Sequence, residues 1–208
     1  EQVGPWEVRP GKDLDDPVRS SRYYKINCPF EESIYVDATR LHLLKEPFFA
    51  ISQEILTTYN DKLFVLQHPH KHSYLNEMME YYNNGWWSKS QIMHYTYMLK
   101  EIGFDFRRFF SPMCTILWRR KCDKFNKTWW EWYQQGGVRD QVSFATALQQ
   151  EKMIFRFDGA LNFLNNFTDA EFGGEWWNVR QGDYSYHKPE DSEEMLKVLC
   201  SLSGLSSF

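Results

Sequence analysis

The chain has 208 residues and a net charge of −4, with 42% hydrophobic and 25% charged residues. This length is sufficient for a buried core, and the composition is typical of a globular domain. The negative charge provides no cationic field, so nucleic acid is not an expected partner. No run of about 18 apolar residues predicts a membrane span within the chain. The sequence starts at Glu1, and its first residues do not form a signal or transit peptide. A leader or anchor that was removed upstream remains possible.

The cysteines leave the cellular compartment undecided. The four cysteines lack the paired spacing of a structural zinc site; they are Cys28, Cys114, Cys122 and Cys200. Reduced core thiols and disulfides formed in an oxidising lumen both remain open. Sequons occur at Asn126 and Asn166, but such tripeptides also arise by chance. The Golgi lumen and the cytoplasm therefore both stay compatible with the sequence.

Aromatic residues make up 18% of the chain, and nine of them are tryptophans. Tryptophan pairs occur at 86–87, 129–130 and 176–177. Indole faces stack on the apolar faces of sugar rings, which suggests carbohydrate chemistry. Burial of a large apolar area in the core is the competing interpretation for each of them. A mobile lid over a sugar is a further hypothesis for Trp176 and Trp177.

The predicted elements alternate between strands and helices, which indicates an α/β layered fold. The opening segment to about Pro29 is expected to be rich in loops. Strands are expected at 33–37, 63–67, 115–118 and 153–157 from their apolar runs. Helices are expected at 47–59, 73–82, 88–103, 123–135, 139–150 and 191–203, several with capping residues at their ends. We find no internal repeat or linker, and we therefore predict one domain over 1–208.

The strand before Asp37 carries the first indication of chemistry. Its residues Ile34, Tyr35 and Val36 are apolar and lead directly to the acid. Open α/β folds bind ligands at the carboxyl ends of such strands. A structural aspartate capping the next turn is the alternative.

A longer pattern extends this observation over most of the chain. The motifs follow in the order Arg19-x-x-Arg22-Tyr-Tyr-Lys25, Ser33-Ile-Tyr-Val-Asp-Ala38, His68-Pro69, Trp129-Trp130-Glu131 and Arg139-Asp-Gln-Val-Ser-Phe144. From about Gly4 to Leu148 the chain resembles a glycosyltransferase-like family of plants, bacteria and large viruses. That family has the pattern R-x-S-R-x-Y-K, S-x-W-x-D-A/G, H-P and W-W-x-E followed by R-D-Q-x-S-F. The chain departs from it at Tyr35, where the family usually has tryptophan.

The resemblance implies a GT-A-like mixed sheet flanked by helices. It also implies a nucleotide-sugar donor, with UDP favoured, and sugar transfer to a glycan or glycoconjugate. Mn²⁺ or Mg²⁺ would neutralise the leaving diphosphate. Asp37 lies close to the start of the chain, although GT-A domains begin with a strand–helix–strand unit for the nucleotide base. Either part of that unit is missing upstream, or the base pocket is built differently.

Donor and metal roles follow from the same resemblance. GT-A enzymes hold the metal with a D-x-D motif, but this chain has Asp37-Ala38-Thr39 and lacks the second acid. Asp37 is therefore expected to need a second metal ligand, for which His187 is the main candidate and His68 another. The donor diphosphate is expected to contact basic residues, because guanidinium and ammonium groups match phosphate oxygens; these are Arg19, Arg22, Lys25 and Lys188, with solvated surface positions as the alternative.

Acceptor and catalytic roles are predicted further along the chain. Asp140 is expected to take the proton of the attacking hydroxyl, with a helix N-cap as the alternative. Acceptor contacts are expected from His68, Glu77, Arg139 and Gln141. Two other functions stay open. One is a catalytically inactive carbohydrate-binding relative, and the other is a glycosidase with Glu77 and Asp140 as paired carboxylates.

Overall fold

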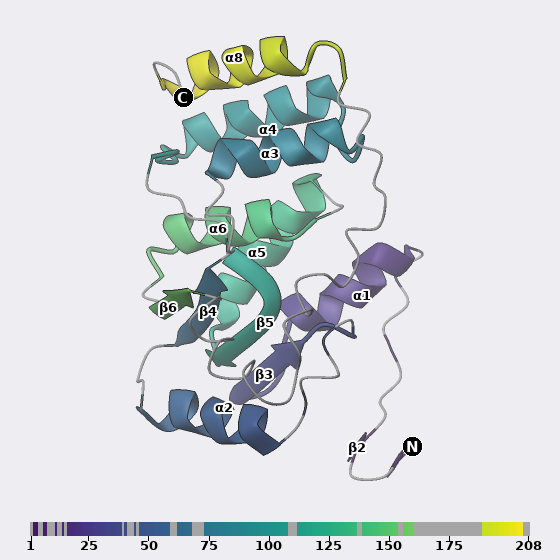
Figure 1. Ribbon diagram of the computed structural model, residues 1–208, viewed down its shortest axis with the longest axis vertical. Helices are drawn as coiled ribbons and strands as arrows, with labels where there is room; N and C mark the ends of the chain where they lie inside the picture. The colour runs from purple at the N-terminus through teal and green to yellow at the C-terminus, as the bar shows by residue number, and fades with distance from the viewer. Residues whose placement is uncertain are drawn as a thin grey trace.

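The computed structural model describes residues 2–3, 6–7, 11, 14, 16–38, 40, 44, 46–58, 62–67, 73–107, 112–136, 139–153, 156–159 and 189–205. Its described part is a stack of helical layers on a mixed sheet (Figure 1). Two short strands, β1 (Gln2–Val3) and β2 (Trp6–Glu7), pair in a separate antiparallel ribbon.

The sheet has four strands in the order β3-β5-β4-β6. The long strand β5 (Pro112–Arg120) runs antiparallel to both β3 (Glu32–Val36) and β4 (Leu63–Gln67). β6 (Arg156–Gly159) pairs in parallel with β4. The register of β4 against β5 shifts between Val65 and Leu66, so β5 bulges beside the end of β3. β3 forms one edge of the sheet and positions the residues that follow it.

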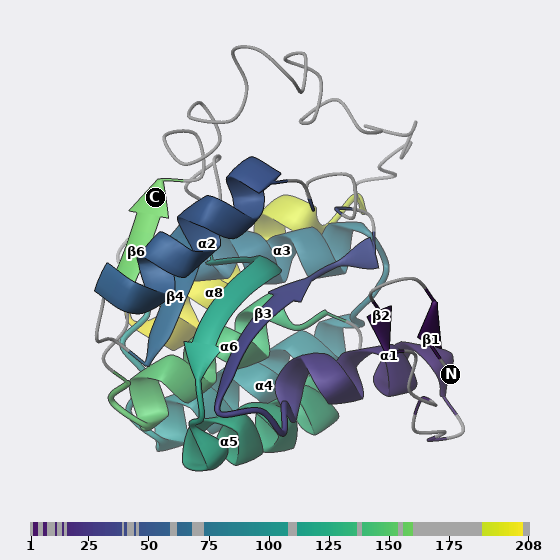
Figure 2. The same cartoon turned by 90° about the horizontal axis from the view of Figure 1, so that it is seen from below.

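Helices cover both faces of this sheet (Figures 1 and 2). α2 (Glu46–Thr58) packs on one face, where its Phe48 and Ile55 meet Ile116 and Trp118 of β5. The opposite face is covered by α1 (Pro17–Ile26), α5 (Asp123–Gly136) and α6 (Gln141–Gln150). Leu117 lies in this second core, because successive strand residues point to opposite faces.

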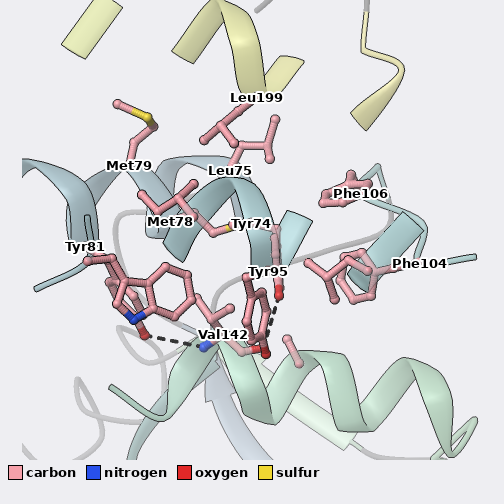
Figure 3. Close-up of a cluster of buried hydrophobic side chains, with 14 of the residues drawn as sticks. Tyr74, Leu75, Met78, Met79, Tyr81, Tyr95, Phe104, Phe106, Val142 and Leu199 are labelled. Carbon is pink, nitrogen blue, oxygen red and sulfur yellow. Dashed lines mark hydrogen bonds between the residues drawn. The ribbon is translucent and has the colours of Figure 1, made fainter. Parts of the chain in front are cut away.

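A third core joins α6 to the outer helices α3 (Tyr74–Asn83), α4 (Lys89–Glu101) and α8 (Ser192–Ser203). Figure 3 shows Leu75 of α3 facing Leu199 of α8, with Tyr74 pointing toward α6. The Tyr74 hydroxyl lies 2.9 Å from Thr146 Oγ1, and the Tyr81 hydroxyl accepts a 3.4 Å hydrogen bond from the Val142 N–H. Helix α6 is therefore packed on two sides, toward the sheet and toward the outer layer.

The expected α/β class is confirmed, and the elements from β3 to α6, together with α8, lie close to their predicted ranges. The capping box of α4 forms as expected, since Ser88 and Gln91 exchange their hydrogen bonds. The GT-A likeness and the single domain remain predictions.

One expectation was wrong, and one strand differed at its ends. The segment expected to be rich in loops contains α1, because the Asp16 side chain accepts hydrogen bonds from Val18 N and Arg19 N, and Pro17 occupies the first turn. The last strand is described at Arg156–Gly159, and Met153 lies outside it, because the strand's position is set by its parallel pairing with β4.

Candidate functional site

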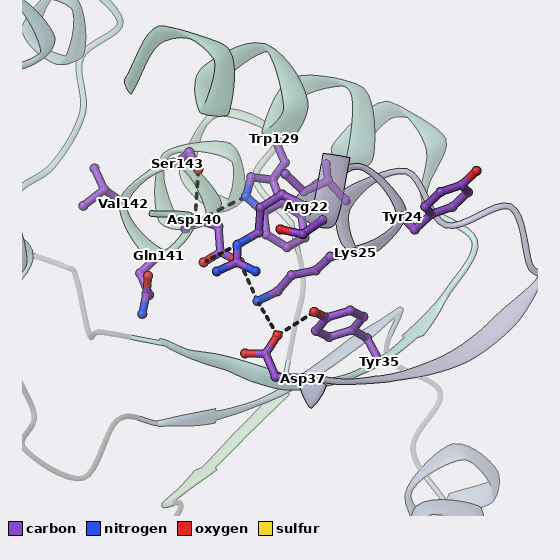
Figure 4. A network of polar contacts seen from close by, with 12 residues as sticks. Arg22, Tyr24, Lys25, Tyr35, Asp37, Trp129, Asp140, Gln141, Val142 and Ser143 are labelled. Atoms are coloured by element: carbon purple, nitrogen blue, oxygen red, sulfur yellow. Dashed lines mark hydrogen bonds and ion pairs between the residues drawn. The ribbon is translucent and has the colours of Figure 1, made fainter. Parts of the chain in front are cut away.

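Four charged residues from three separate parts of the chain converge on the sheet face that α1 and α6 cover (Figure 4). Lys25 Nζ lies 2.5 Å from Asp140 Oδ2 and 3.8 Å from Asp37 Oδ1. Arg22 Nε lies 3.9 Å from Asp140 Oδ1. Arg22 and Lys25 are three residues apart on α1, so both project from one side of the helix. We call Arg22, Lys25, Asp37 and Asp140 the charged cluster.

Asp37 is held at the end of β3 by its own strand and by β5. Its N–H donates a 2.8 Å hydrogen bond to the Thr115 carbonyl. The Tyr35 hydroxyl donates a 2.5 Å hydrogen bond to Asp37 Oδ1, and Lys25 Nζ lies 4.9 Å from the Tyr35 ring centroid. The Asp37 side chain keeps 20% of its surface exposed. Asp37 is thus positioned through one carboxylate oxygen while it stays accessible to a ligand.

Asp140 precedes α6 but does not cap it, since its side chain makes no capping hydrogen bond. Its carboxylate turns to Lys25 instead, and its backbone carbonyl accepts hydrogen bonds from Trp129 Nε1 and Ser143 Oγ. Burial raises the pKa of Asp140, but the charges of Lys25 and Arg22 outweigh it, so the net pKa is lowered. Asp140 is therefore a buried, ionised carboxylate, and the simple N-cap alternative does not describe it.

Several buried polar atoms near this cluster have no hydrogen-bond partner among the described residues, among them Arg22 Nε, Thr115 Oγ1 and Tyr133 Oη. Leaving such a buried group without a partner costs about 1–3 kcal/mol, and native structures rarely keep several together. Tyr133 lies on α5 within electrostatic reach of Arg22 and Asp140, and burial raises its pKa to about 12. These atoms therefore have unused hydrogen-bonding capacity beside the cluster, and each of them is buried from solvent.

Tyr133 was not among the site residues expected from the sequence. It follows Trp129 by four residues on the buried face of α5, so helical periodicity alone predicts a core residue. Its hydroxyl, which has no hydrogen-bond partner in the described part of the chain, becomes informative only once α1 is placed beside α5.

Other predicted site residues lie around the cluster without joining it. Arg19 pairs with Asp16 at 3.6 Å, and Arg139 lies 4.1 Å from the Trp86 ring centroid. Gln141 Oε1 accepts a 3.4 Å hydrogen bond from the Tyr81 hydroxyl. Glu77 is buried on α3. Burial, with the Asp140 and Glu77 charges adding to it, raises the pKa of Cys114, which places Glu77 in electrostatic reach of the same region.

The remaining predictions lie outside the described residues: Thr39, His68, Trp176, Trp177, His187 and Lys188. Within the described part of the chain, no group of three or more His, Cys, Asp and Glu side chains is arranged to hold a metal ion. Asp37 is the accessible carboxylate of the cluster, and the Lys25 ammonium already lies between it and Asp140. These residues alone therefore do not fit a divalent ion.

The tryptophan pairs that the structure describes belong to the core. Trp87 and Trp129 are buried, while Trp130 stacks on Tyr133 with ring centroids 5.5 Å apart.

The four cysteines are free thiols. No described helix is both long and apolar enough to cross a membrane. In comparisons with known proteins, no family model, curated protein or solved structure matches this chain.

Proposed function

We propose that the chain is a glycosyltransferase that moves a sugar from a nucleotide-sugar donor, with UDP favoured, to a glycan or glycoconjugate acceptor. The charged cluster is the main support, because it joins two carboxylates and two cations beside buried polar atoms that have no hydrogen-bond partner in the described part of the chain. An arrangement of this kind suits a polar, charged substrate. The choice of substrate class rests on the resemblance of the motif order to glycosyltransferases.

Arg22 is the cation that we assign to the donor diphosphate. Its side chain is 23% exposed, and its Nε has no hydrogen-bond partner among the residues that the structure describes. A guanidinium donates to two phosphate oxygens at once, which matches a diphosphate better than a single ammonium does. Lys25 is only 1% exposed, so in this arrangement its ammonium holds the two carboxylates instead of reaching solvent. Direct contact of Lys25 with the donor remains a prediction.

The two carboxylates receive different roles in this proposal. Asp37 faces the ligand because it is the more exposed of the two. Asp140 is 4% exposed and paired with Lys25, and its lowered pKa makes it a weak proton acceptor. We therefore propose that Asp140 positions Lys25 and, through it, Asp37. The base role expected from the resemblance stays an untested prediction.

Mn²⁺ or Mg²⁺ remains part of the proposal through Asp37, whose further predicted ligand is His187. A divalent ion there would stabilise the negative charge that develops on the leaving diphosphate. Since the described residues alone do not fit the ion, the assigned steps use Arg22, Lys25 and the two aspartates.

Calorimetry with UDP and with GDP, each with and without Mn²⁺, tests the proposal. We expect metal-dependent binding of UDP, and Asp37→Ala should abolish the metal-dependent heat. Arg22→Ala should weaken binding about tenfold or more, as expected for loss of about 1.4 kcal/mol or more from a charge-assisted hydrogen bond. Lys121→Ala is the matched control, because Lys121 is exposed and pairs with Glu31 on the surface, away from the charged cluster.

Absence of binding in every combination would contradict the glycosyltransferase proposal. Nucleotide binding without sugar transfer or donor hydrolysis would favour the catalytically inactive carbohydrate-binding relative. Persistence of the metal-dependent heat in Asp37→Ala would place the metal elsewhere in the chain.

A further inference from the structure

An open pocket of about 550 Å³ lies between α2 and the sheet, with Ile34 of β3 and Leu56 of α2 among its lining residues. Side chains alternate along β3, so Ile34 faces α2 while Tyr35 faces the charged cluster. The pocket is thus on the opposite face of the sheet from Asp37. Its volume lies within the range of about 300–1,000 Å³ that is usual for small-molecule sites.

The charges that border this pocket are fixed and compensated. Arg120 Nε lies 2.8 Å from Glu32 Oε1, and a second nitrogen of Arg120 donates to the Leu56 carbonyl near the carboxyl end of α2. The guanidinium thus holds the Glu32 carboxylate in place. Because the two opposite charges of this pair cancel, the described residues that line the pocket carry no excess cation to attract a phosphate. A neutral ligand suits the pocket better than an anion.

One wall of the pocket is aromatic. Phe49 is 40% exposed, and Gln53 and Thr57 follow it one and two turns later on the same side of α2. The Phe49 ring meets the buried Phe48 ring edge to face at 5.9 Å, which helps to fix its orientation. The pocket therefore presents an exposed aromatic ring next to a carboxylate and an amide.

This combination matches the chemistry of a sugar ring. A pyranose has an apolar C–H face that stacks on an aromatic ring, and hydroxyl groups around its rim that both donate and accept hydrogen bonds. Glu32 accepts hydrogen bonds, and the Gln53 amide both donates and accepts them. We propose that this pocket binds a neutral saccharide unit, stacked on Phe49 and hydrogen-bonded to Glu32 and Gln53. The site is separate from the charged cluster and does not depend on the function proposed for it.

Titration of the whole chain with neutral oligosaccharides tests this proposal. The probes are maltohexaose, cellohexaose, mannohexaose and xylohexaose, measured by calorimetry and by saturation-transfer NMR. We expect at least one of them to bind. Phe49→Ala should weaken that binding at least tenfold, and Gln53→Ala should weaken it to a smaller extent. Both side chains are exposed, so the variants should fold, which circular dichroism verifies.

Tyr97→Ala is the matched control, because Tyr97 is 49% exposed on α4, which does not line the pocket. It should bind like the unmodified chain. Asp37→Ala should also keep saccharide binding, which separates this site from the nucleotide site. The proposal is overturned if none of the four probes binds, if Phe49→Ala binds normally, or if Tyr97→Ala loses binding equally. Preference for an anionic hexasaccharide such as oligogalacturonate would overturn the neutral-ligand assignment.

Discussion

Lys25 is a charged side chain in a place where an unpaired charge would be strongly destabilising. It is 1% exposed, and its ammonium is balanced by Asp140 at 2.5 Å and by Asp37 further away. Arg22 adds a second positive charge, so the cluster is close to neutral as a whole. Removing one member of the cluster is therefore expected to lower the stability of the protein. The larger part of this loss comes from the buried charge that is left uncompensated, and the smaller part from the lost attraction.

This reasoning predicts the behaviour of the Lys25–Asp140 pair in a double-mutant cycle. Lys25→Met should lower the free energy of unfolding by about 3–5 kcal/mol, because Asp140 is left buried without its nearest cation. Adding Asp140→Leu should recover much of that loss, since an apolar pair of similar volume carries no charge. Urea unfolding measures the cycle. Lys121→Met, at an exposed lysine, should leave stability unchanged, and additive losses in the double variant would contradict the pairing.

The lowered pKa of Asp140 predicts a pH dependence of stability. Because the pKa is lower in the folded protein than in the unfolded chain, the unfolded chain takes up the proton first as the pH falls. The stabilisation is therefore complete well above about pH 3.9, the usual aspartate value, and is lost as the pH falls through the folded pKa. Unfolding of the unmodified chain and of Asp140→Asn should differ at pH 7 and converge at low pH. A constant difference would contradict the assignment.

Tyr133 offers a test that separates stability from ligand binding. Its buried hydroxyl has no partner among the described residues, so Tyr133→Phe should leave stability unchanged or raise it by up to about 1 kcal/mol. If the hydroxyl contacts the substrate, the same change should weaken UDP binding in calorimetry. Tyr74→Phe is the control, because its hydroxyl bonds to Thr146. It should cost about 1 kcal/mol of stability without changing UDP affinity. A loss of stability in Tyr133→Phe with unchanged UDP affinity would contradict a role of Tyr133 in the site.

At the scale of elements, the end of α5 depends on a close approach to the segment before α4. An added Cβ at Gly136 would lie 2.5 Å from Trp87 Cζ2, and Trp87 Nε1 donates a 2.6 Å hydrogen bond to the Gly136 carbonyl. Gly136→Ala should therefore destabilise the protein by about 1–3 kcal/mol through overpacking. Gly11→Ala is the control, because a Cβ added there would meet no described atom within 4 Å, and it should change stability by less than about 0.5 kcal/mol. Thermal unfolding distinguishes the two, and equal effects would contradict this contact.

The sequence predicted most elements because their signals are local. The capping box at Ser88 and the glycine after α8 mark helix ends that the structure confirms, with Gly204 at φ 72°. The helix α1 was missed although Asp16-Pro17 is a helix-start signal. Its sequence consists largely of basic, serine and tyrosine residues, so it lacks a clear apolar periodicity. The last strand was predicted, but its ends were placed too early, because strand pairing, which is not local, sets them.

The candidate site was predictable only in part for the same reason. Arg22, Lys25, Asp37 and Asp140 were all named from the motif order, and they do meet in the structure. Which of these residues contacts a ligand and which positions the others depends on their burial and their distances. The spacing of motifs in the sequence gives neither quantity. Motif order also does not reveal that Asp140 faces Lys25 instead of capping α6.

At the scale of the whole molecule, the layers share elements that couple them. α6 contributes Val142 and Ala145 to the outer core, and Phe144 and Leu148 to the core against the sheet. β5 likewise contributes side chains to the cores on both of its faces. A layer that detached alone would expose one side of a shared element, which carries a large apolar surface. The described layers are therefore expected to unfold together, as one domain.

Pulsed thiol labelling in urea tests this expectation at two distant positions. Cys114 lies on β5 in the core next to the charged cluster, and Cys200 lies on α8 in the outermost layer. Two variants, each keeping one of these buried cysteines and carrying serine or alanine at the other three, report on the two layers separately. In each variant, the urea midpoint of thiol labelling is compared with the midpoint at which the same variant loses its far-ultraviolet circular dichroism. The two midpoints should coincide in both variants. Labelling of Cys200 at clearly lower urea would show that α8 detaches on its own, because a local opening exposes its thiol while Cys114 stays protected.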